Sequence, residues 1–240
     1  MSGGPMLGPD AGTLAEDQVR AMFDRIAGVY DVLNSVMTVG LHHGWRARAV
    51  DVAGVGPGDR VLDVATGTGD LAIALKRRVG SAGEVVGSDF SEGMLELARA
   101  KAGDVEFEVG NALDLPYEDD SFDAATVGFG ARNFADLARG LAEMARVVRP
   151  GGRVVVLELT TPERPPLSWF FRVWFDRIVP VLGRAAGDSE AYTYLPSSVR
   201  RFPNARGLAA AMAAVGLVDV RWILTCGGII AIHAGTVEPA

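Results

Sequence analysis

A strand-like segment that leads through a glycine turn into a helix constrains this chain more than any other feature of its sequence. The run from Val61 to Ala65 predicts a buried strand, and Gly67, Thr68 and Gly69 follow it before a helical pattern begins. Glycines let the backbone approach a ligand closely, and the start of a helix directs N–H groups toward that ligand. The segment therefore predicts a nucleotide-binding corner in an α/β domain.

A second feature, Asp89, lies 20 residues after Gly69 at the end of another strand-like run. A carboxylate at this place can accept hydrogen bonds from both ribose hydroxyls of an adenosine. Dinucleotides and S-adenosylmethionine both fit this geometry, and the pattern Gly67-x-Gly69-x-x-Ala72 alone is a weak dinucleotide fingerprint. Asp63 favours S-adenosylmethionine, because D-x-x-x-G-x-G resembles the first motif of class I methyltransferases, where the acid helps to place the methionine end of the cofactor.

Strand-like and helix-like segments alternate along most of the chain. Strands are expected over residues 60–65, 84–89, 105–109, 122–127, 153–159, 217–223 and 229–235. Helices are expected over residues 69–79, 91–101, 135–147 and 208–215, with Pro150-Gly151-Gly152 as a helix-to-strand turn. This order predicts a parallel sheet with helices on both faces. The resemblance to the first motif of class I methyltransferases implies their Rossmann-like fold, with a seven-stranded, mostly parallel sheet.

The remaining segments predict one domain over residues 14–240, after a disordered tail at 1–13. Residues 14–52 read as N-terminal helices. Residues 160–203 are rich in proline and aromatic residues and interrupt the alternation. We expect them to form a helical substrate cap over the carboxyl edge of the sheet, where ligands of open α/β sheets bind.

Composition narrows the class of protein. The net charge of −7 argues against non-specific nucleic-acid binding. The single cysteine, Cys226, excludes an intramolecular disulfide and a cysteine-based zinc site, and we expect no metal. No apolar run reaches the ~18–20 residues that a membrane span needs, and a cytoplasmic location is predicted.

Two longer segments resemble signatures of one family, the ubiquinone/menaquinone biosynthesis C-methyltransferases. The segment from Tyr30 to Trp45 is similar to Y-D-x-M-N-x-x-x-S-x-G-x-H-R-x-W, with His43 in place of the arginine. Residues 146–160 are similar to R-V-x-K-P-G-G…E-x-S. The family's serine two residues before F-G-x-R-N is replaced here by a glycine directly before Phe129, which leaves backbone atoms alone for that cofactor contact.

The resemblance implies methyl transfer from S-adenosylmethionine to a ring carbon of a polyprenylated quinol. The acceptor would be demethylmenaquinol, or the methoxy-benzoquinol of the ubiquinone route. Polar atoms after the third strand are placed to reach the adenine. The residues expected to bind the cofactor are Asp63, Gly67, Thr68, Gly69, Asp89, Asn111, Ala112 and Gly128.

Four residues are candidates for the chemistry. Arg132 is always charged and offers several donors to a developing phenolate, and Asn133 could hold the same oxygen or a water. Tyr30 and His42 are second candidates, with His42 in the range of a general base. Each also has a structural interpretation: a salt bridge for Arg132, helix packing for Tyr30 and a structural hydrogen bond for His42. His233, in an apolar strand, is expected to be a core histidine.

Partners follow from the same resemblance. A polyprenyl substrate resides in the bilayer, so we expect transient contact with the inner face of the plasma membrane. The aromatic cluster at 169–175 is either core or the mouth for an isoprenoid tail. The sequence is also compatible with a homodimer.

Three other functions remain as alternatives. A short-chain reductase needs Tyr-x-x-x-Lys, which neither Lys76 nor Lys101 provides. The others are a non-catalytic cofactor-binding subunit, and a methyltransferase that acts on another phenol or a secondary metabolite.

Overall fold

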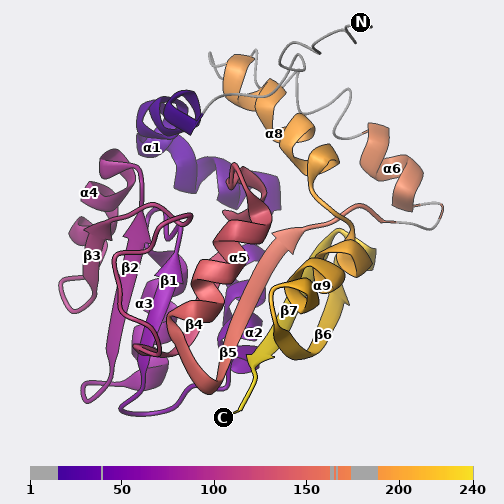
Figure 1. The fold of residues 1–240 in the computed structure, drawn as a ribbon. Helices are drawn as coiled ribbons and strands as arrows, with labels where there is room; N and C mark the ends of the chain where they lie inside the picture. The colour runs from indigo at the N-terminus through magenta and orange to yellow at the C-terminus, as the bar shows by residue number, and fades with distance from the viewer. Residues whose placement is uncertain (1–15, 39, 163–164, 166, 174–188, 240) are drawn as a thin grey trace, which may run out of the picture.

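The computed structural model describes residues 16–38, 40–162, 165, 167–173 and 189–239. In this part of the chain, seven strands form one sheet in the order β3-β2-β1-β4-β5-β7-β6 (Figure 1). Their bounds are β1 Arg60–Val64, β2 Glu84–Asp89, β3 Glu106–Val109, β4 Phe122–Gly128, β5 Val148–Leu159, β6 Leu217–Thr225 and β7 Ile230–Val237. Strands β1 to β5 pair in parallel, and β7 runs antiparallel to both of its neighbours. The predicted seven-stranded, mostly parallel sheet is confirmed.

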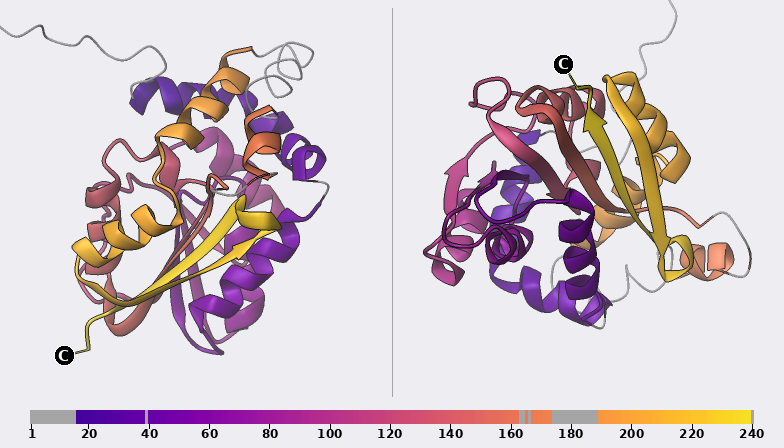
Figure 2. Two further views of the ribbon diagram at one scale, coloured as in Figure 1. Left: turned by 90° about the vertical axis from the view of Figure 1, so that its right-hand side faces the viewer. Right: turned by 90° about the horizontal axis from the view of Figure 1, so that it is seen from below.

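Helices cover both faces of this sheet. The helices are α2 His42–Ala53, α3 Asp70–Val79 and α4 Glu92–Lys101 on one face, with α5 Leu137–Arg146 and α9 Ala205–Ala214 on the other (Figures 1 and 2). Alternation along the strands explains the two layers, because successive side chains point to opposite faces. In β1, Val61 packs in the layer with α2 and α3, whereas Leu62 packs in the layer with α5 and α9.

Further helices lie at the carboxyl edge of the sheet. They are α1 Glu16–Thr38, α6 Leu167–Val173 and α8 Ser189–Arg201 (Figures 1 and 2). Val19 and Met22 of α1 pack with Tyr194 of α8 in a small separate core, and Phe23 and Phe90 lie against it. Elements about 170 residues apart in the sequence therefore meet at this edge.

Most of the predicted elements lie within two residues of their expected bounds, but two differ. The strand β5 begins at Val148, where Val148 pairs with Phe122, so Pro150-Gly151-Gly152 lies within the strand as an irregularity and not in a turn before it. Helix α9 begins at Ala205, because the side chain of Asn204 accepts a hydrogen bond from the Gly207 N–H at 2.8 Å.

Some of the expected segments lie outside the residues that the structure describes. The predicted tail at 1–13 is one of them, as are residues 174–188 of the predicted cap, which include Trp174 and Phe175 of the aromatic cluster. Within that cluster, Phe171 is buried and Trp169 is 62% exposed.

Candidate functional site

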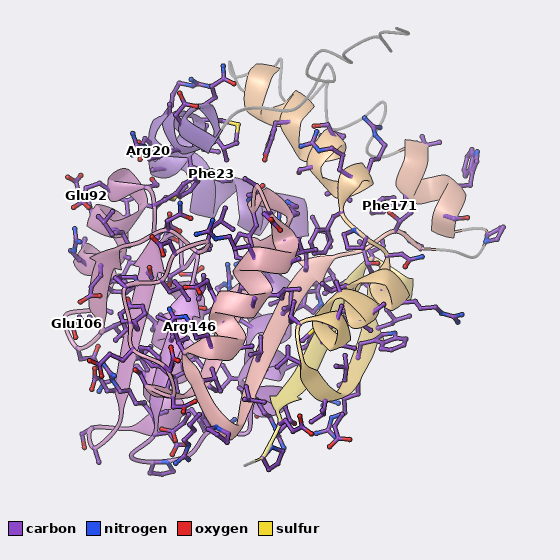
Figure 3. The ribbon with its side chains drawn as sticks, viewed as in Figure 1. Arg20, Phe23, Glu92, Glu106, Arg146 and Phe171 are labelled. Atoms are coloured by element: carbon purple, nitrogen blue, oxygen red, sulfur yellow. The ribbon has the colours of Figure 1, made fainter. Side chains whose placement is uncertain are left out.

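A cavity opens at the carboxyl ends of β1, β2, β3 and β4, the edge at which ligands of open α/β sheets bind. Four chain segments at the carboxyl ends of these strands line it: 65–68, 89–90, 110–113 and 128–130. Helices contribute as well, with Phe23 from α1 and Arg46 from α2. Figure 3 labels Phe23 on the α1 helix, and its ring centroid lies 6.4 Å from that of Phe90.

Two residues other than glycine that line the cavity have left-handed backbone conformations. Ala65 has φ +50° and Phe129 has φ +61°, values that residues other than glycine rarely adopt. Each directly follows a central strand, and the Phe129 N–H donates to the Leu157 carbonyl at 2.8 Å. Such strained conformations persist only where the surrounding packing holds them, and they are common at ligand sites.

The two glycines of the β1–α3 turn have different surroundings. Gly67 has φ +57°, and a Cβ built on it meets no atom within 4 Å, so this backbone faces open space in the cavity. Gly69 has φ +81° at the N-cap of α3, and its Cβ would lie 2.8 Å from the ring of Phe107. Gly69 is not among the described residues that line the cavity, and the closeness of Phe107 gives it a part in shaping the turn. Its contact with the cofactor stays a prediction.

Asp63 lies at the floor of the cavity and is 1% exposed. Its carboxylate accepts hydrogen bonds from the hydroxyls of Thr66 and Thr126, both at 2.6 Å. Burial raises the pKa of Asp63 to about 6, although both hydroxyls act to lower it. Asp63 therefore ties the glycine turn to β4, and Thr68, which is also buried, lines the cavity beside it.

Asp89 holds the same turn from the end of β2. One carboxylate oxygen accepts from the Gly67 N–H at 2.8 Å and the other from the Ser91 N–H at 2.9 Å. An ionised carboxylate has about four acceptor positions, so a pair of ribose hydroxyls can still be bound. Burial raises the pKa of Asp89 to about 6.

The turn after β3 and the end of β4 complete the part of the cavity predicted to hold the cofactor. Asn111 and Ala112 both line it, and the Asn111 side-chain oxygen accepts from the Leu113 N–H at 2.9 Å. Gly128 lines it as well, and a Cβ there would lie 3.0 Å from Leu71, so a larger residue would require Leu71 to move slightly.

The predicted catalytic pair lies in the short 3-10 helix η1, Ala131–Asn133, directly after β4. Asn133 lines the cavity, whereas Arg132 is not among the described lining residues. The Arg132 guanidinium pairs with Glu158 of β5 at 2.8 Å and also donates to the Phe129 carbonyl. Both partners of this ion pair are buried, with side chains 8% and 1% exposed.

Sequence reasoning assigned no role to two residues beside this pair. Glu158 also accepts from the backbone N–H of Arg132 at 3.2 Å, and its charge within the apolar strand β5 was the available signal. Tyr194 of α8 donates its hydroxyl to the Asn133 side-chain oxygen at 3.2 Å. Burial raises the pKa of Tyr194, which keeps this phenol protonated as a donor.

Of the second candidates, the structure describes the side chain of His42 alone. Tyr30 lies within α1, but its side chain is outside the description. His42 is 3% exposed, forms a 2.7 Å hydrogen bond with the Thr38 hydroxyl, and is not among the described lining residues. His233 is buried in β7 with Nε2 2.7 Å from the Ala205 carbonyl, as expected of a core histidine.

The charges of the cavity are uneven. Among the described residues that line it, the ionised side chains are three carboxylates, Asp63, Asp70 and Asp89, and one guanidinium, Arg46. This set suits a ligand with net positive charge that also carries one anionic group. The open space beside Gly67 admits such a ligand next to backbone N–H groups.

Comparison with known proteins shows which family this chain resembles. The sequence model of the "ubiE/COQ5 methyltransferase family" matches residues 12–237. The chain is 48% identical over 219 residues to a demethylmenaquinone methyltransferase of Thermus thermophilus, which covers 89% of this chain and 99% of that protein. It is 51% identical over 214 residues to a demethylmenaquinone methyltransferase of Deinococcus radiodurans, covering 87% of this chain and 88% of that protein.

Solved structures show the same fold at lower sequence identity. A SAM-dependent methyltransferase from Aquifex aeolicus superposes with a TM-score of 0.58 at 17% identity, covering 94% of this chain and 100% of that chain. A geranyl diphosphate methyltransferase in complex with SAM superposes with a TM-score of 0.57 at 20% identity, covering 81% and 85%. Within the described part of this chain, no helix is long and apolar enough to cross a bilayer.

Proposed function

This chain belongs to the ubiE/COQ5 methyltransferase family, and we propose that it methylates a ring carbon of demethylmenaquinol, with S-adenosylmethionine as the methyl donor. The observation that carries the proposal is the match of nearly the whole chain to two demethylmenaquinone methyltransferases at 48% and 51% identity. The related methoxy-benzoquinol of ubiquinone synthesis is a second acceptor, supported by a 40% identical relative named for both pathways.

The cofactor is S-adenosylmethionine, and the residues around the cavity fit it. When bound, it supplies a methyl group made electrophilic by the sulfonium. We assign Asp89 to the ribose hydroxyls and Asn111 and Ala112 to the adenine, because all three line the cavity. Gly67, Thr68 and Gly128 border the space for the methionine portion, above the floor that Asp63 forms.

The acceptor ring becomes nucleophilic when a hydroxyl ortho or para to the reacting carbon loses its proton. We assign Asn133 to hold this oxygen, because its side chain lines the cavity and Tyr194 fixes its orientation. Arg132 stands behind it as the charge that stabilises the phenolate. Because Arg132 is paired with Glu158, the phenolate would feel the dipole of an ion pair and not an isolated positive charge. A guanidinium is too weak a base to take the proton itself.

Three parts of the proposal concern regions away from this geometry. Tyr30 and His42 stay second candidates for the substrate wall. Membrane-surface contact is supported by the exposed Trp169 on α6, next to the carboxyl edge of the sheet. The polyprenyl tail of the acceptor gives a reason for such contact, and a homodimer remains compatible with it.

The test is a turnover assay. Purified protein is incubated with S-adenosylmethionine and reduced demethylmenaquinone, and we expect a product heavier by one methyl group on the ring. In Asn133→Ala we expect kcat to fall by about 10–100-fold with the Kd for the cofactor nearly unchanged. Arg149→Ala, at an arginine that is 60% exposed on the far end of β5, should leave both values unchanged.

The other outcomes separate the alternatives. Cofactor binding without product would move the acceptor to the ubiquinone intermediate or to another phenol. Cofactor binding without turnover on any phenol would favour a non-catalytic subunit. Absence of cofactor binding would contradict the proposal as a whole.

A dependence of cofactor affinity on pH follows from the two buried carboxyls. The pKa values of Asp63 and Asp89 are both raised from 3.8 to about 6, and a cationic ligand favours their ionised forms. We therefore expect affinity to rise with pH between about 5 and 7, by up to about tenfold per carboxyl, and to level above that. Calorimetry across this range measures it, and a flat profile would contradict the assignment.

In the ligand-free protein the same pKa shifts make the free energy of unfolding fall with rising pH, whereas cofactor affinity rises. The folded state keeps protons that the unfolded chain releases, because the unfolded pKa is near 3.8 and the folded pKa near 6. The contribution of these two carboxyls to the free energy of unfolding therefore falls as pH rises from about 4 to about 6. Bound cofactor should offset this loss.

A further inference from the structure

We propose that Arg46 binds the α-carboxylate of the methionine portion of the cofactor. This inference rests on the proposed function and goes beyond it, because sequence reasoning assigned Arg46 no role. It is carried by three observations: the position of Arg46 in the cavity, a buried nitrogen without a hydrogen bond, and the balance of charge around it.

Position comes first. Arg46 projects from α2 into the same cavity as Gly67 and Thr68 of the β1–α3 turn. Helix α2 contacts α3 and β4, so it lies on the side of the cavity away from β3. If Asp89 binds the ribose and the turn after β3 contacts the adenine, the methionine portion extends toward α2.

The Arg46 guanidinium is held by an ion pair, but one of its nitrogens makes no hydrogen bond in the part of the chain that the structure describes. The Arg46 side chain is 11% exposed, and Nη1 lies 3.2 Å from a carboxylate oxygen of Asp70. Nevertheless Nη1 is buried and makes no hydrogen bond within the described residues. The other oxygen of Asp70 lies 3.0 Å from the Lys101 ammonium, so Asp70 is shared between two cations. A buried donor that makes no hydrogen bond is uncommon, and a ligand that supplies the acceptor accounts for it.

Charge balance selects the ligand group. Arg46 is the one basic residue among the described residues that line the cavity. S-adenosylmethionine carries one anionic group, the α-carboxylate, beside a cationic ammonium and a cationic sulfonium. The planar guanidinium matches a carboxylate, and such charge-assisted hydrogen bonds are stronger than neutral ones. The three aspartates of the cavity, in turn, favour the cationic groups.

The test compares three ligands by calorimetry: S-adenosylmethionine, its decarboxylated analogue and adenosine. Arg46→Met keeps the length of the side chain and removes its charge. We expect this variant to bind S-adenosylmethionine about 10–100-fold more weakly. The analogue and adenosine lack the carboxylate and should change by less than about threefold. Arg46→Lys should retain part of the preference for the carboxylate, because it keeps a point charge.

Arg48→Met is the matched control, since Arg48 lies on the same helix and is exposed. It should leave all three affinities unchanged. Equal weakening of all three ligands in Arg46→Met would overturn the inference in favour of a structural ion pair with Asp70. An unchanged affinity for S-adenosylmethionine would overturn it as well. If the unmodified protein fails to bind S-adenosylmethionine at all, the proposed function fails, and that result is distinct from both.

Discussion

Replacement of Glu158 by alanine is expected to lower the free energy of unfolding by about 3–5 kcal/mol. The Arg132 side chain is 8% exposed, and its 2.8 Å contact with Glu158 compensates its charge. Removing the carboxylate leaves a buried cation and frees the backbone N–H of Leu159, which donates to the same carboxylate. Loss of one partner of a buried pair is more harmful than loss of both, because desolvation of the remaining charge is not repaid.

Urea denaturation measures this change, and two controls interpret it. Glu158→Gln keeps the size of the side chain and an acceptor oxygen, so we expect a smaller loss. Asp51→Ala removes one partner of the ion pair with Arg78, where the side chains are 57% and 40% exposed, and should change stability by less than about 1 kcal/mol. If Glu158→Ala and Asp51→Ala have the same small effect, solvent reaches the Arg132 pair.

Replacement of Asp89 by asparagine is expected to weaken cofactor binding by about 100-fold or more. Two hydrogen bonds from ribose hydroxyls to a charged acceptor contribute about 1.5–3 kcal/mol each, and every 1.4 kcal/mol is tenfold in Kd. Gly67 and Ser91 each donate a backbone N–H to one oxygen of the carboxylate, and asparagine would place its NH2 group opposite one of these two donors. The effect should therefore include some loosening of the glycine turn.

Calorimetry with adenosine separates this role from that of Arg46. Adenosine contains the ribose, so Asp89→Asn should weaken adenosine and S-adenosylmethionine alike, whereas Arg46→Met should spare adenosine. Asp104→Asn, at an exposed position before β3, is the matched control and should change neither affinity. A Kd for adenosine that survives Asp89→Asn would place the ribose elsewhere.

The strands and the cofactor corner could be predicted because their signals are local. The strand β2 was expected at 84–89 and has these bounds, since a compact apolar run ends there in an acid. The helix α4 begins after Ser91, whose hydroxyl accepts from the Met94 N–H as a predicted N-cap does. Each such feature depends on residues within one turn of each other.

The parts that could not be predicted depend on residues far apart in the sequence. Gly69 follows the same pattern as Gly67, and the pattern does not reveal that a side chain at Gly69 would meet the ring of Phe107. Arg46 comes from α2 and Tyr194 from α8, two helices far apart in the sequence, and the residues next to each of them in the sequence give no signal of a place near the site. The salt bridge predicted as the structural interpretation of Arg132 is present, but its partner Glu158 lies 26 residues away in the sequence.

The small core shared by α1 and α8 has a consequence for how such a chain can diverge. The cofactor corner is built from one continuous stretch. By contrast, Phe23 of α1 lines the cavity and Tyr194 of α8 contacts the lining residue Asn133, and these two remote helices pack on each other. An exchange of one helix alone would leave Val19 and Met22 of α1, or Tyr194 of α8, without complementary packing. Substitutions in these two helices are therefore coupled, and the two segments can change together while the corner beneath them stays unchanged.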